Sequence, residues 1–528
     1  MTARSTQVII VGAGATGLAL AGELALAGVR CRVIERHATG TRESRTNCLH
    51  ARSMETLDLR GQATAFTDIG LPIRTLPLGF EGSGVDLRRL DTDFPYMLNI
   101  REHQVEELLE AWATRLGAEV VRSTAALGVE QDEEEVLVTV AGPDGRRVER
   151  AAYAVGCDGA RSTVREAVGV PFAGVGINAG TGLGAGDPGE GGAGGDPDSI
   201  PGSVVLADVR LEGLPADEAY GGLTDDGMAF VFPFRDGTCR VVLYDYARTP
   251  AAERPAGEPV TLEEVRAGLV RRTGRTDLLP RDLGWSGRFS GENRQAPAYR
   301  TGRVFLAGSA ALSHLPVGAQ GPDTGLADAV NLGWKLAARM KGWAPDRLLD
   351  SYHDERHPAG RDALARTARQ IRLNAANTTL HRLLRWLAHR VVVPLPPVQA
   401  RLAGAYSGVA AAYSPGGQHP HPLAGTRLPR GTLTLPGGSR TRLYDLFADG
   451  RFVLLDHDLH AERYGGLPRH VRTVPYLSCD RRRWPAAALV RPDGYIAWAH
   501  DETDPALRAP MVRQAVQVWC SAVTSRAG

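Results

Sequence analysis

A glycine-rich turn near the start of the chain has the residue types and the spacing that bind a dinucleotide. An apolar run at 8–11 leads into the turn, and a helical pattern over 18–27 follows it. In such a turn Gly12 permits the tight bend, Gly14 lets a pyrophosphate approach the backbone, and Gly17 lets helix and strand pack closely. The order of strand, turn and helix therefore predicts a dinucleotide-binding unit.

The residues around this turn supply the other contacts expected of such a unit. Ala15 and Thr16 begin the helix, whose first N–H groups and partial positive charge would face phosphate oxygens. Glu35 ends a second apolar run at 31–34, and Arg36 follows it. The Glu35 carboxylate would accept hydrogen bonds from an adenosine ribose. The alternative is a glycine-rich turn in an unrelated αβ unit, but here strand, helix and acid are all in place.

A second match to the same glycine spacing, at 184–189, lacks this context. No apolar run leads into it, and Pro188 lies inside it. The match sits in a glycine-rich stretch, which is typical of a flexible surface loop. The sequence thus predicts one dinucleotide site.

Further motifs resemble, in order, the flavin-binding segments of a known enzyme family. Residues 153–162 resemble its Asp-Gly motif. Residues 303–311 open a strand-to-helix turn that continues through 316–321 into a helix with 328–336, which looks like its second flavin motif. On these motifs the chain is identified as a member of the group A FAD-dependent monooxygenases, in the branch that acts on bacterial polyketides.

The resemblance implies both a cofactor and a reaction. FAD would be bound, NADPH or NADH would reduce it transiently, and oxygen would be transferred to an electron-rich ring or ketone. Arg52 and residues 349–358 also fit the family pattern, but no catalytic acid or base is implied. Beyond the first turn, the implied cofactor contacts are Arg45, Glu102, Asp158, Gly308, Ser309, Pro316, Gly321, Pro322 and Asp323.

The second flavin motif departs from the family pattern at several positions. Ser309 stands where the family has an aspartate that bonds the ribitol chain, and Leu312 replaces a histidine. Pro322 has no N–H to offer at the flavin's pyrimidine edge. Asp323 replaces an asparagine, and a carboxylate at that edge would oppose an anionic reduced flavin. Together these changes predict a weakened redox site rather than weakened adenine binding.

One further departure precedes the helical pattern over 102–116. Arg101 and Glu102 replace a Pro-Gln pair that helps to place the cofactor in the family.

The middle of the chain changes to a strand-rich pattern. Strand-like runs occur at 203–211, 228–234 and 238–246, and a turn signal at 235–237 joins the last two. An antiparallel sheet is expected here, as one wall of a substrate cavity. Four residues are candidates for the lining of that cavity: Tyr220, Arg235, Tyr244 and His314.

The implied architecture is an α/β fold with several domains, as the length of 528 residues requires. A doubly wound FAD-binding domain of the glutathione-reductase-like Rossmann type is interrupted by the antiparallel-sheet domain and followed by a thioredoxin-like domain. That last domain has no Cys-x-x-Cys pair, so it is expected to serve packing or homodimer contact. The expected boundaries are 1–172 and 301–395 for the FAD-binding domain, 173–300 for the substrate domain and 396–528 for the C-terminal domain.

Composition excludes several other classes of protein. The formal net charge of +1 favours neither nucleic acid nor an acidic membrane surface as a partner. The longest apolar runs are too short to span a membrane, and the start of the chain leaves no room for a secretory signal. The six cysteines are scattered, without metal-ligand spacing, and read as reduced thiols of a cytoplasmic protein. No metal site is expected.

Two functions follow from this pattern. The first is an NAD(P)H- and oxygen-dependent hydroxylase or Baeyer–Villiger enzyme acting on a large, polyketide-like molecule. The second is a non-redox cyclase, for example a (4+2) cycloaddition catalyst, with FAD structural or lost, because cycloaddition needs shape and positioning more than acids or bases. A binding or chaperoning protein is a third, weaker idea.

Overall fold

The structure is a computed structural model. It describes residues 6–40, 46–176, 203–245, 259–289, 292–314, 317–318, 320–375, 378–414, 420–457, 464 and 466–520. Arg45, Pro316 and the second glycine-rich match at 184–189 lie outside the described residues.

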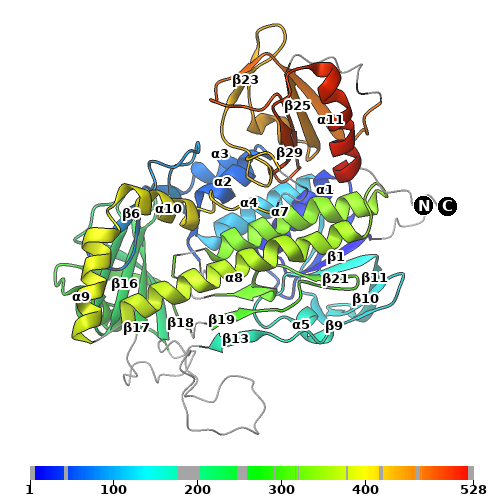
Figure 1. The fold of residues 1–528 in the computed structure, drawn as a ribbon. Helices are drawn as coiled ribbons and strands as arrows, with labels where there is room; N and C mark the ends of the chain where they lie inside the picture. Colours follow the sequence, from blue (N-terminus) through cyan, green and yellow to red (C-terminus); the bar gives the residue numbers. More distant parts are fainter. Residues whose placement is uncertain are drawn as a thin grey trace.

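A mostly parallel six-stranded sheet includes strands β1 and β21, which lie in the right-hand part of Figure 1. Its middle strand, β1, is buried on both faces, which is why the sequence there is a continuous apolar run rather than an alternating one. Only the edge pair β20–β21 is antiparallel. The strand order is β20 (Arg300–Thr301), β21 (Val304–Leu306), β12 (Tyr153–Gly156), β1 (Val8–Val11), β2 (Cys31–Ile34) and β8 (Glu119–Val121).

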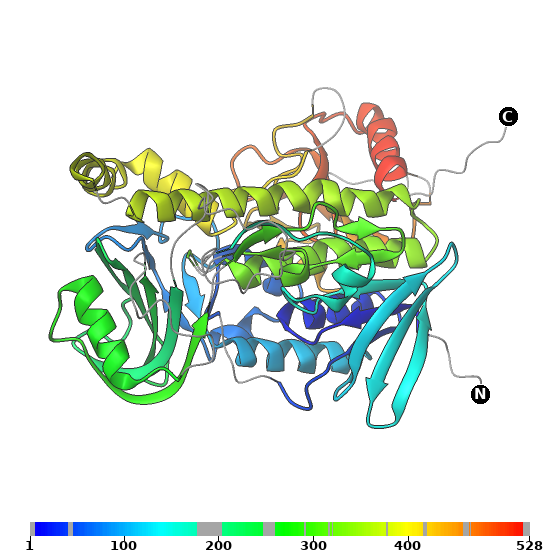
Figure 2. The same ribbon diagram turned by 90° about the horizontal axis from the view of Figure 1, so that it is seen from below.

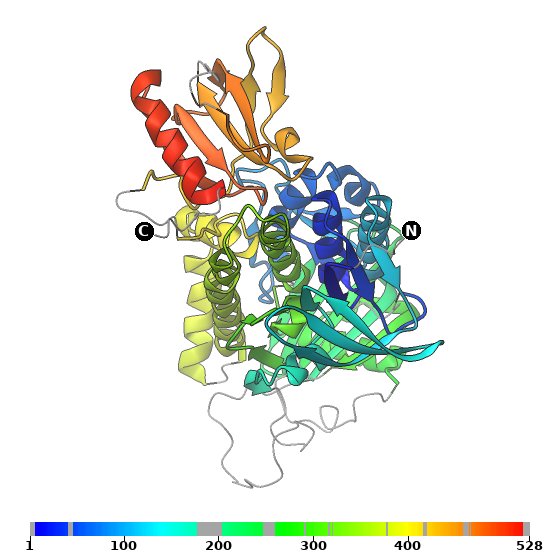
Figure 3. The ribbon, with the colours of Figure 1, turned by 90° about the vertical axis from the view of Figure 1, so that its right-hand side faces the viewer.

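Helices cover one face of this sheet, and a smaller sheet covers the other (Figures 2 and 3). Helix α1 (Ala15–Leu26) packs between α4 (Glu102–Arg115) and α7 (Gly321–Met340). The small sheet consists of β9 (Ala125–Gln131), β10 (Val136–Gly142) and β11 (Gly145–Ala151). This arrangement confirms the predicted α/β fold class.

A five-stranded antiparallel sheet follows in the middle of the chain, as expected. Its inner face packs on the long helix α8 (Arg347–Ala375), and its outer face is covered by α6 (Leu262–Thr273). The strand order is β15 (Tyr220–Thr224), β16 (Gly227–Pro233), β17 (Thr238–Asp245), β14 (Ser203–Glu212) and β18 (Leu279–Phe289).

Short elements join these two sheets. Helix α2, which follows β2 in the chain, packs on α7, and the three-residue turn η1, which follows β21, packs on α7 as well. The bounds are β3 (Cys48–Leu49), α2 (Ala51–Asp58), α3 (Ala63–Thr67), β4 (Leu71–Ile73), β5 (Thr75–Pro77), β6 (Gly84–Asp86), β7 (Met97–Asn99), α5 (Thr163–Ala167), β13 (Ala173–Gly176), β19 (Glu292–Gln295), η1 (Gly308–Ala310) and β22 (Leu312–Ser313).

Past α8 the chain forms α9 (Thr379–Leu387), η2 (Ala388–Val392) and α10 (Pro396–Tyr406). The prolines at 394–397 do end the preceding helical run, but Pro396 and Pro397 also open α10, because the first helical turn needs no proline N–H.

The C-terminal domain sits on top of the sheet and helices in the view of Figure 1. A four-stranded sheet, ordered β26-β25-β28-β29, packs against the terminal helix. The bounds are β23 (Thr432–Thr434), β24 (Arg440–Arg442), η3 (Tyr444–Phe447), β25 (Phe452–His457), β26 (Val471–Tyr476), β27 (Ser478–Cys479), β28 (Ala487–Val490), β29 (Ile496–His500) and α11 (Pro505–Cys520).

Candidate functional site

The first glycine turn is shaped by how closely its backbone meets other segments. Gly12 has φ +105°, and a Cβ there would lie 2.4 Å from the carbonyl oxygen of Cys157. A Cβ on Gly17 would lie 2.0 Å from the oxygen of Gly12. A Cβ on Gly14 would meet nothing closer than a Glu106 oxygen at 3.6 Å. The turn is therefore closed at Gly12 and Gly17 and open at Gly14, which fits a backbone that a pyrophosphate approaches.

Helix α1 starts directly after this open position. Gly14 is its N-cap, and no side chain caps the helix, so the N–H groups of Ala15 and Thr16 begin a first turn without a side-chain acceptor. Glu35 closes the turn from β2: its Oε2 accepts the N–H of Ala13 at 2.8 Å, and its Oε1 accepts that of His37 at 2.8 Å.

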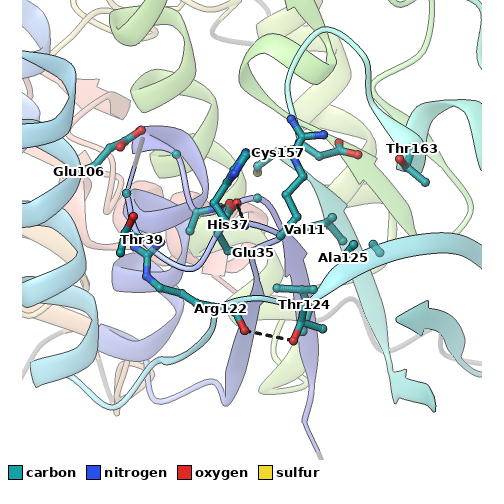
Figure 4. Close-up of a pocket in the computed structure, with 18 of the residues that line it drawn as sticks. Val11, Glu35, His37, Thr39, Glu106, Arg122, Thr124, Ala125, Cys157 and Thr163 are labelled. Atoms are coloured by element: carbon teal, nitrogen blue, oxygen red, sulfur yellow. Dashed lines mark hydrogen bonds between the residues drawn. The ribbon is translucent and has the colours of Figure 1, made fainter. Parts of the chain in front are cut away.

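A cavity of about 260 Å³ lies over this turn (Figure 4). Glu35 and His37 reach it from the end of β2, Glu106 from α4, and Arg122 from the end of β8. Arg36, which is exposed and donates from Nε to His37 Nε2 at 3.2 Å, also lines it.

Glu106 is a site residue that sequence reasoning missed. Burial, followed by repulsion from Glu102 and Glu35, raises the pKa of its carboxyl to about 8. Glu102 itself accepts the N–H of Thr46 at 3.4 Å. Glu106 is thus neutral over most of the physiological range, beside the one glycine of the turn that faces open space. Its place one helical turn after Glu102 was the available signal.

Asp158 lines the same cavity but organises its own turn. Its Oδ1 accepts the Ser162 hydroxyl at 2.5 Å, and its Oδ2 accepts the N–H of Val164 at 3.1 Å. Burial raises the pKa of this carboxyl, against these hydrogen bonds.

Thr16 joins the first motif to the second. A Cβ on Gly308 would lie 2.5 Å from Thr16 Oγ1, and one on Gly325 would lie 2.1 Å from it. Gly308 has φ +58°, and its N–H donates to Asp328 at 3.0 Å. Two glycines therefore let η1 and α7 close around one threonine. Ser309, the next residue of η1, is exposed.

The two departures at the start of α7 have different structural consequences. Pro322 occupies the first turn of the helix, where proline is tolerated. The Asp323 Oδ1 accepts the N–H of His50 at 2.8 Å and the hydroxyl of Ser53 at 2.6 Å. These donors lie at the start of α2, where a helix dipole stabilises an anion. The sequence predicted that this carboxylate would repel the flavin edge. In the structure its Oδ1 is stabilised by two donors of the protein.

Two histidines, His314 and His50, lie near the start of α7, and His314 was predicted to line the pocket. A Cβ on Gly321 would be 3.8 Å from His314 Nε2, so this candidate pocket residue lies against the second motif. His50 is fully buried, and its Nε2 is 3.0 Å from the Gly318 oxygen.

Arg101, a departure from the family pattern, ties α4 to the middle sheet. Its guanidinium lies 3.0 Å from Asp236 and 2.6 Å from Thr238, on the turn between β16 and β17. The same group stacks over Phe234 at 4.1 Å. An arginine in place of proline has thus gained a contact between two domains.

The other predicted pocket residues do not converge. Tyr244 lies on the inner face of the middle sheet and is fully buried. Tyr220 packs on the outer face, where the Arg275 guanidinium is 5.3 Å from its ring. Arg235 is exposed at the turn and donates to the Gly70 oxygen at 3.3 Å. The assignment of Tyr220 to the pocket was therefore wrong. The alternation of side chains along β15 places it on the outer face, which α6 covers.

A buried charge network attaches the C-terminal domain to the helices. Arg491 donates to both oxygens of Glu355 on α8, at 2.7 and 2.9 Å, and Lys335 on α7 reaches the same carboxylate at 2.9 Å. Burial alone would raise the pKa of Glu355, but Arg491 and Lys335 hold it well below its usual value. This gives the segment 349–358 a structural role.

Several kinds of site are absent from the part of the chain that the structure describes. No group of three or more His, Cys, Asp or Glu residues could hold a metal ion there. The cysteines are all free thiols, including Cys479 and Cys520 in the C-terminal domain. Among the described helices, none has the length and apolar character to cross a bilayer.

Comparison with models of known protein families assigns the chain to one family. The FAD binding domain model matches residues 5–182 and 203–367, and the C-terminal domain model of aromatic-ring hydroxylases matches 421–522. The chain belongs to the FAD-dependent aromatic-ring hydroxylase family. The glycine cradle, open at Gly14, fits the pyrophosphate of this cofactor.

Members of this family resemble the chain along nearly its full length. The rifampicin monooxygenase of Streptomyces venezuelae is 38% identical, over 94% of this chain and 96% of its own. The structure of OxyS, an anhydrotetracycline hydroxylase from Streptomyces rimosus, has a TM-score of 0.80 and 35% identity, covering 98% of this chain and 99% of its own. The structure of the Diels-Alderase PyrE3, from pyrroindomycin biosynthesis, has a TM-score of 0.78 and 34% identity, with 98% and 100% covered.

Proposed function

We propose that the chain is an FAD-dependent monooxygenase that uses NADPH or NADH and oxygen to oxidise a large, polyketide-like molecule, by hydroxylation or Baeyer–Villiger oxidation. Membership of the hydroxylase family supports the reaction class. The names of its relatives, a rifampicin monooxygenase and an anhydrotetracycline hydroxylase, support the class of substrate.

The hydrogen bonds of Asp323 are the observation that favours a redox function over a non-redox one. The sequence argued against flavin reduction through several departures taken together, and this anion was one of them. His50 and Ser53 at the start of α2 hold one carboxylate oxygen, and the partial positive charge of the helix start offsets part of the negative charge, while the other oxygen is buried without a hydrogen-bond partner among the described residues. Pro322 then remains as the main departure on α7, and it removes a donor without adding a charge.

The chain's own residues would bind and orient the cofactor. When bound, FAD would accept hydride from the nicotinamide and supply the reduced flavin that activates oxygen, which is the oxidant. Gly14 and the first N–H groups of α1 would hold the pyrophosphate, and Glu35 would hold the ribose. Glu106 is neutral when protonated and would add no repulsion against the phosphates. The remaining predicted contacts, including Asp158 and Ser309, stay proposals of the same kind.

The substrate is proposed to lie against the inner face of the middle sheet. That face packs with apolar side chains toward Val317, α8 and α10, and Tyr244 lies among them. A large apolar molecule would be bound there mainly by burial of its surface. The domain boundaries 1–172, 173–300, 301–395 and 396–528 belong to this proposal.

A non-redox cyclase is the second candidate. Ser309 and Pro322 each remove a polar group that the family offers to the flavin, and the Diels-Alderase PyrE3 has the same fold at a similar identity. A (4+2) cycloaddition would need a substrate site of the right shape rather than the flavin's electrons.

Anaerobic mixing of the FAD-loaded protein with NADPH separates the two candidates. A monooxygenase bleaches its flavin absorbance on mixing, consumes oxygen in turnover, and incorporates one ¹⁸O atom from labelled oxygen into the product. A cyclase yields an isomer of its substrate and keeps its rate without NADPH or oxygen. Candidate polyketides can be ranked first by the acceleration of NADPH oxidation that they cause.

The outcome that overturns our proposal is product formation that is unchanged in the absence of oxygen and nicotinamide. The variant Gly14→Val is the matched control: it should lose bound flavin and, with it, the oxygen-dependent product.

A further inference from the structure

Helix α9 presents its apolar side to solvent and its polar side to the protein. Arg385 is buried, donates to the Asn374 oxygen at 2.7 Å and lies 3.4 Å from Asp225. One turn later, His389 is buried between Ser83 at 2.9 Å and Asn374 at 3.2 Å. The polar side chains of α9 and of the start of η2 therefore already have their partners inside the molecule.

The outward face of α9 is a continuous apolar stripe. Leu380, Leu383, Leu384 and Leu387 follow helical spacing i, i+3, i+4 and i+7, and they are 64, 54, 47 and 38% exposed. Trp386 lies beside them and is 49% exposed. Helix α9 lies at the edge of the molecule in Figures 1 and 2, and the exposure of its apolar side chains shows that the described residues leave much of the stripe open to solvent. Apolar patches of this extent mark interaction surfaces.

The chain around this stripe is strongly basic. Residues 363–401 contain seven arginines and no Asp or Glu. Arg372, Arg382 and Arg390 are exposed close to α9 in sequence, and Arg382 pairs with Asp225 at 3.2 Å. The net charge of +1 for the whole chain conceals this local excess.

We propose that α9 and the following turn η2, the α9 surface, dock on an anionic lipid bilayer. Leucines and a tryptophan on one side of a helix flanked by arginines are the pattern of helices that lie in the bilayer interface. Valines 391 and 392 of η2 extend the stripe and are also exposed. The sequence analysis disfavoured a membrane partner on total charge and on the length of the apolar runs, and it did not consider this local distribution.

A second copy of the chain fits the same surface less well. Two-fold pairing would set each α9 surface against itself. Asp225 pairs with Arg382 and Arg385, but the exposed arginines beyond this pair, such as Arg390, would face their own copies as like charges. An anionic surface would instead attract these arginines.

Vesicle flotation tests the proposal. The purified full chain should float with vesicles of equimolar phosphatidylcholine and phosphatidylglycerol, and about tenfold less with phosphatidylcholine alone or at high salt. The double change Leu383→Ser with Leu387→Ser should reduce binding at least about tenfold. The matched control, Leu507→Ser with Val518→Ser on α11, removes comparably exposed apolar side chains and should bind as the unchanged chain does.

Three results overturn the proposal: no flotation with anionic vesicles, equal flotation of the α9 variant and its control, or a dimer that only the α9 variant dissociates while vesicles stay unbound. The last result would assign the surface to a second copy. Tryptophan emission should shift to the blue on vesicle binding, and this shift should be absent in Trp386→Ala. The measurement is independent of flotation.

Discussion

The two halves of the proposed flavin site are built on different principles. The first, from Gly12 to Gly17, is shaped by backbone contacts so close that two of its three glycines admit no other residue. The second, from Gly308 to Asp323, combines one close backbone approach, at Gly308, with side-chain hydrogen bonds at Asp323, which several residue types can make. A change at a close backbone contact breaks the fold or the site, whereas a change at a side-chain hydrogen bond redirects that bond. Departures from a family motif therefore carry less information about function in the second half.

The largest expected effect tests the first half. Gly14→Val should reduce FAD affinity more than about 100-fold, because a side chain would stand where the pyrophosphate approaches the backbone. The melting temperature of the flavin-free protein should stay the same, since a Cβ at Gly14 meets nothing within 3.5 Å. Fluorescence titration of FAD and a thermal melt check both points. Gly128→Val, at another open position on β9, is the control. Undiminished affinity would refute the assignment of the turn.

The next effect concerns Glu106, whose pKa is raised to about 8 by burial and then by neighbouring carboxylates. Below that value the neutral acid tolerates a pyrophosphate, and above it the new anion repels one. FAD affinity should therefore fall about tenfold between pH 7 and pH 9. Glu106→Gln should flatten the profile.

The same shift affects the stability of the flavin-free protein. A raised carboxyl pKa favours the folded state below the unfolded value near 4.5, and this contribution is lost as the pH rises through about 8. Denaturant titrations across that window should show a decline that Glu106→Gln reduces. Identical pH profiles for the two proteins would exclude Glu106 as the titrating group.

A smaller effect is expected at Ser309 in the second half. Ser309→Asp restores the family's acid on an exposed turn, and it should raise FAD affinity about fivefold by one added charge-assisted hydrogen bond. Isothermal titration checks this, with Ser309→Ala as the comparison. Weaker binding of the aspartate variant would show that η1 does not face the ribitol chain.

The smallest effect is expected at Asp323. From the sequence, Pro322→Leu with Asp323→Asn should speed flavin reduction, if both residues lie at the pyrimidine edge. Because the carboxylate is bonded to His50 and Ser53, we expect the single change Asp323→Asn to alter the rate less than about threefold. Stopped-flow reduction by NADPH measures this. A large acceleration would place the anion at the flavin after all and reopen the cyclase hypothesis.

Backbone patterns made most of the fold predictable. The continuous apolar run of β1, the mostly apolar β2, the glycine turn and the hairpin between β16 and β17 depend on local sequence, and the structure contains them. The direction of a side chain was less predictable. Tyr220 was assigned to the cavity on residue type alone, but strand alternation places it beside Val231 on the outer face.

Contacts between distant segments could not be read from the sequence. The bond from Ser53 to Asp323 joins residues far apart in the chain, and so does the pair of Arg491 with Glu355. The exposed stripe of α9 has the periodicity typical of a core helix, and periodicity alone does not tell which side of a helix faces solvent. The burial of Arg385 in α9 and of His389 in η2 shows that the polar side faces the protein.

The order of strands in the central sheet has a consequence for how the protein folds. Val8 pairs with Tyr153, and Ala154 in turn pairs with Val304. The first strand therefore pairs with a segment that is synthesised much later. During synthesis, the early β1–β2 pair must persist with an open edge until β12 and then β21 emerge from the ribosome. Such non-local pairing slows folding and leaves an unpaired strand exposed. We therefore expect chains that stop before β21 to aggregate.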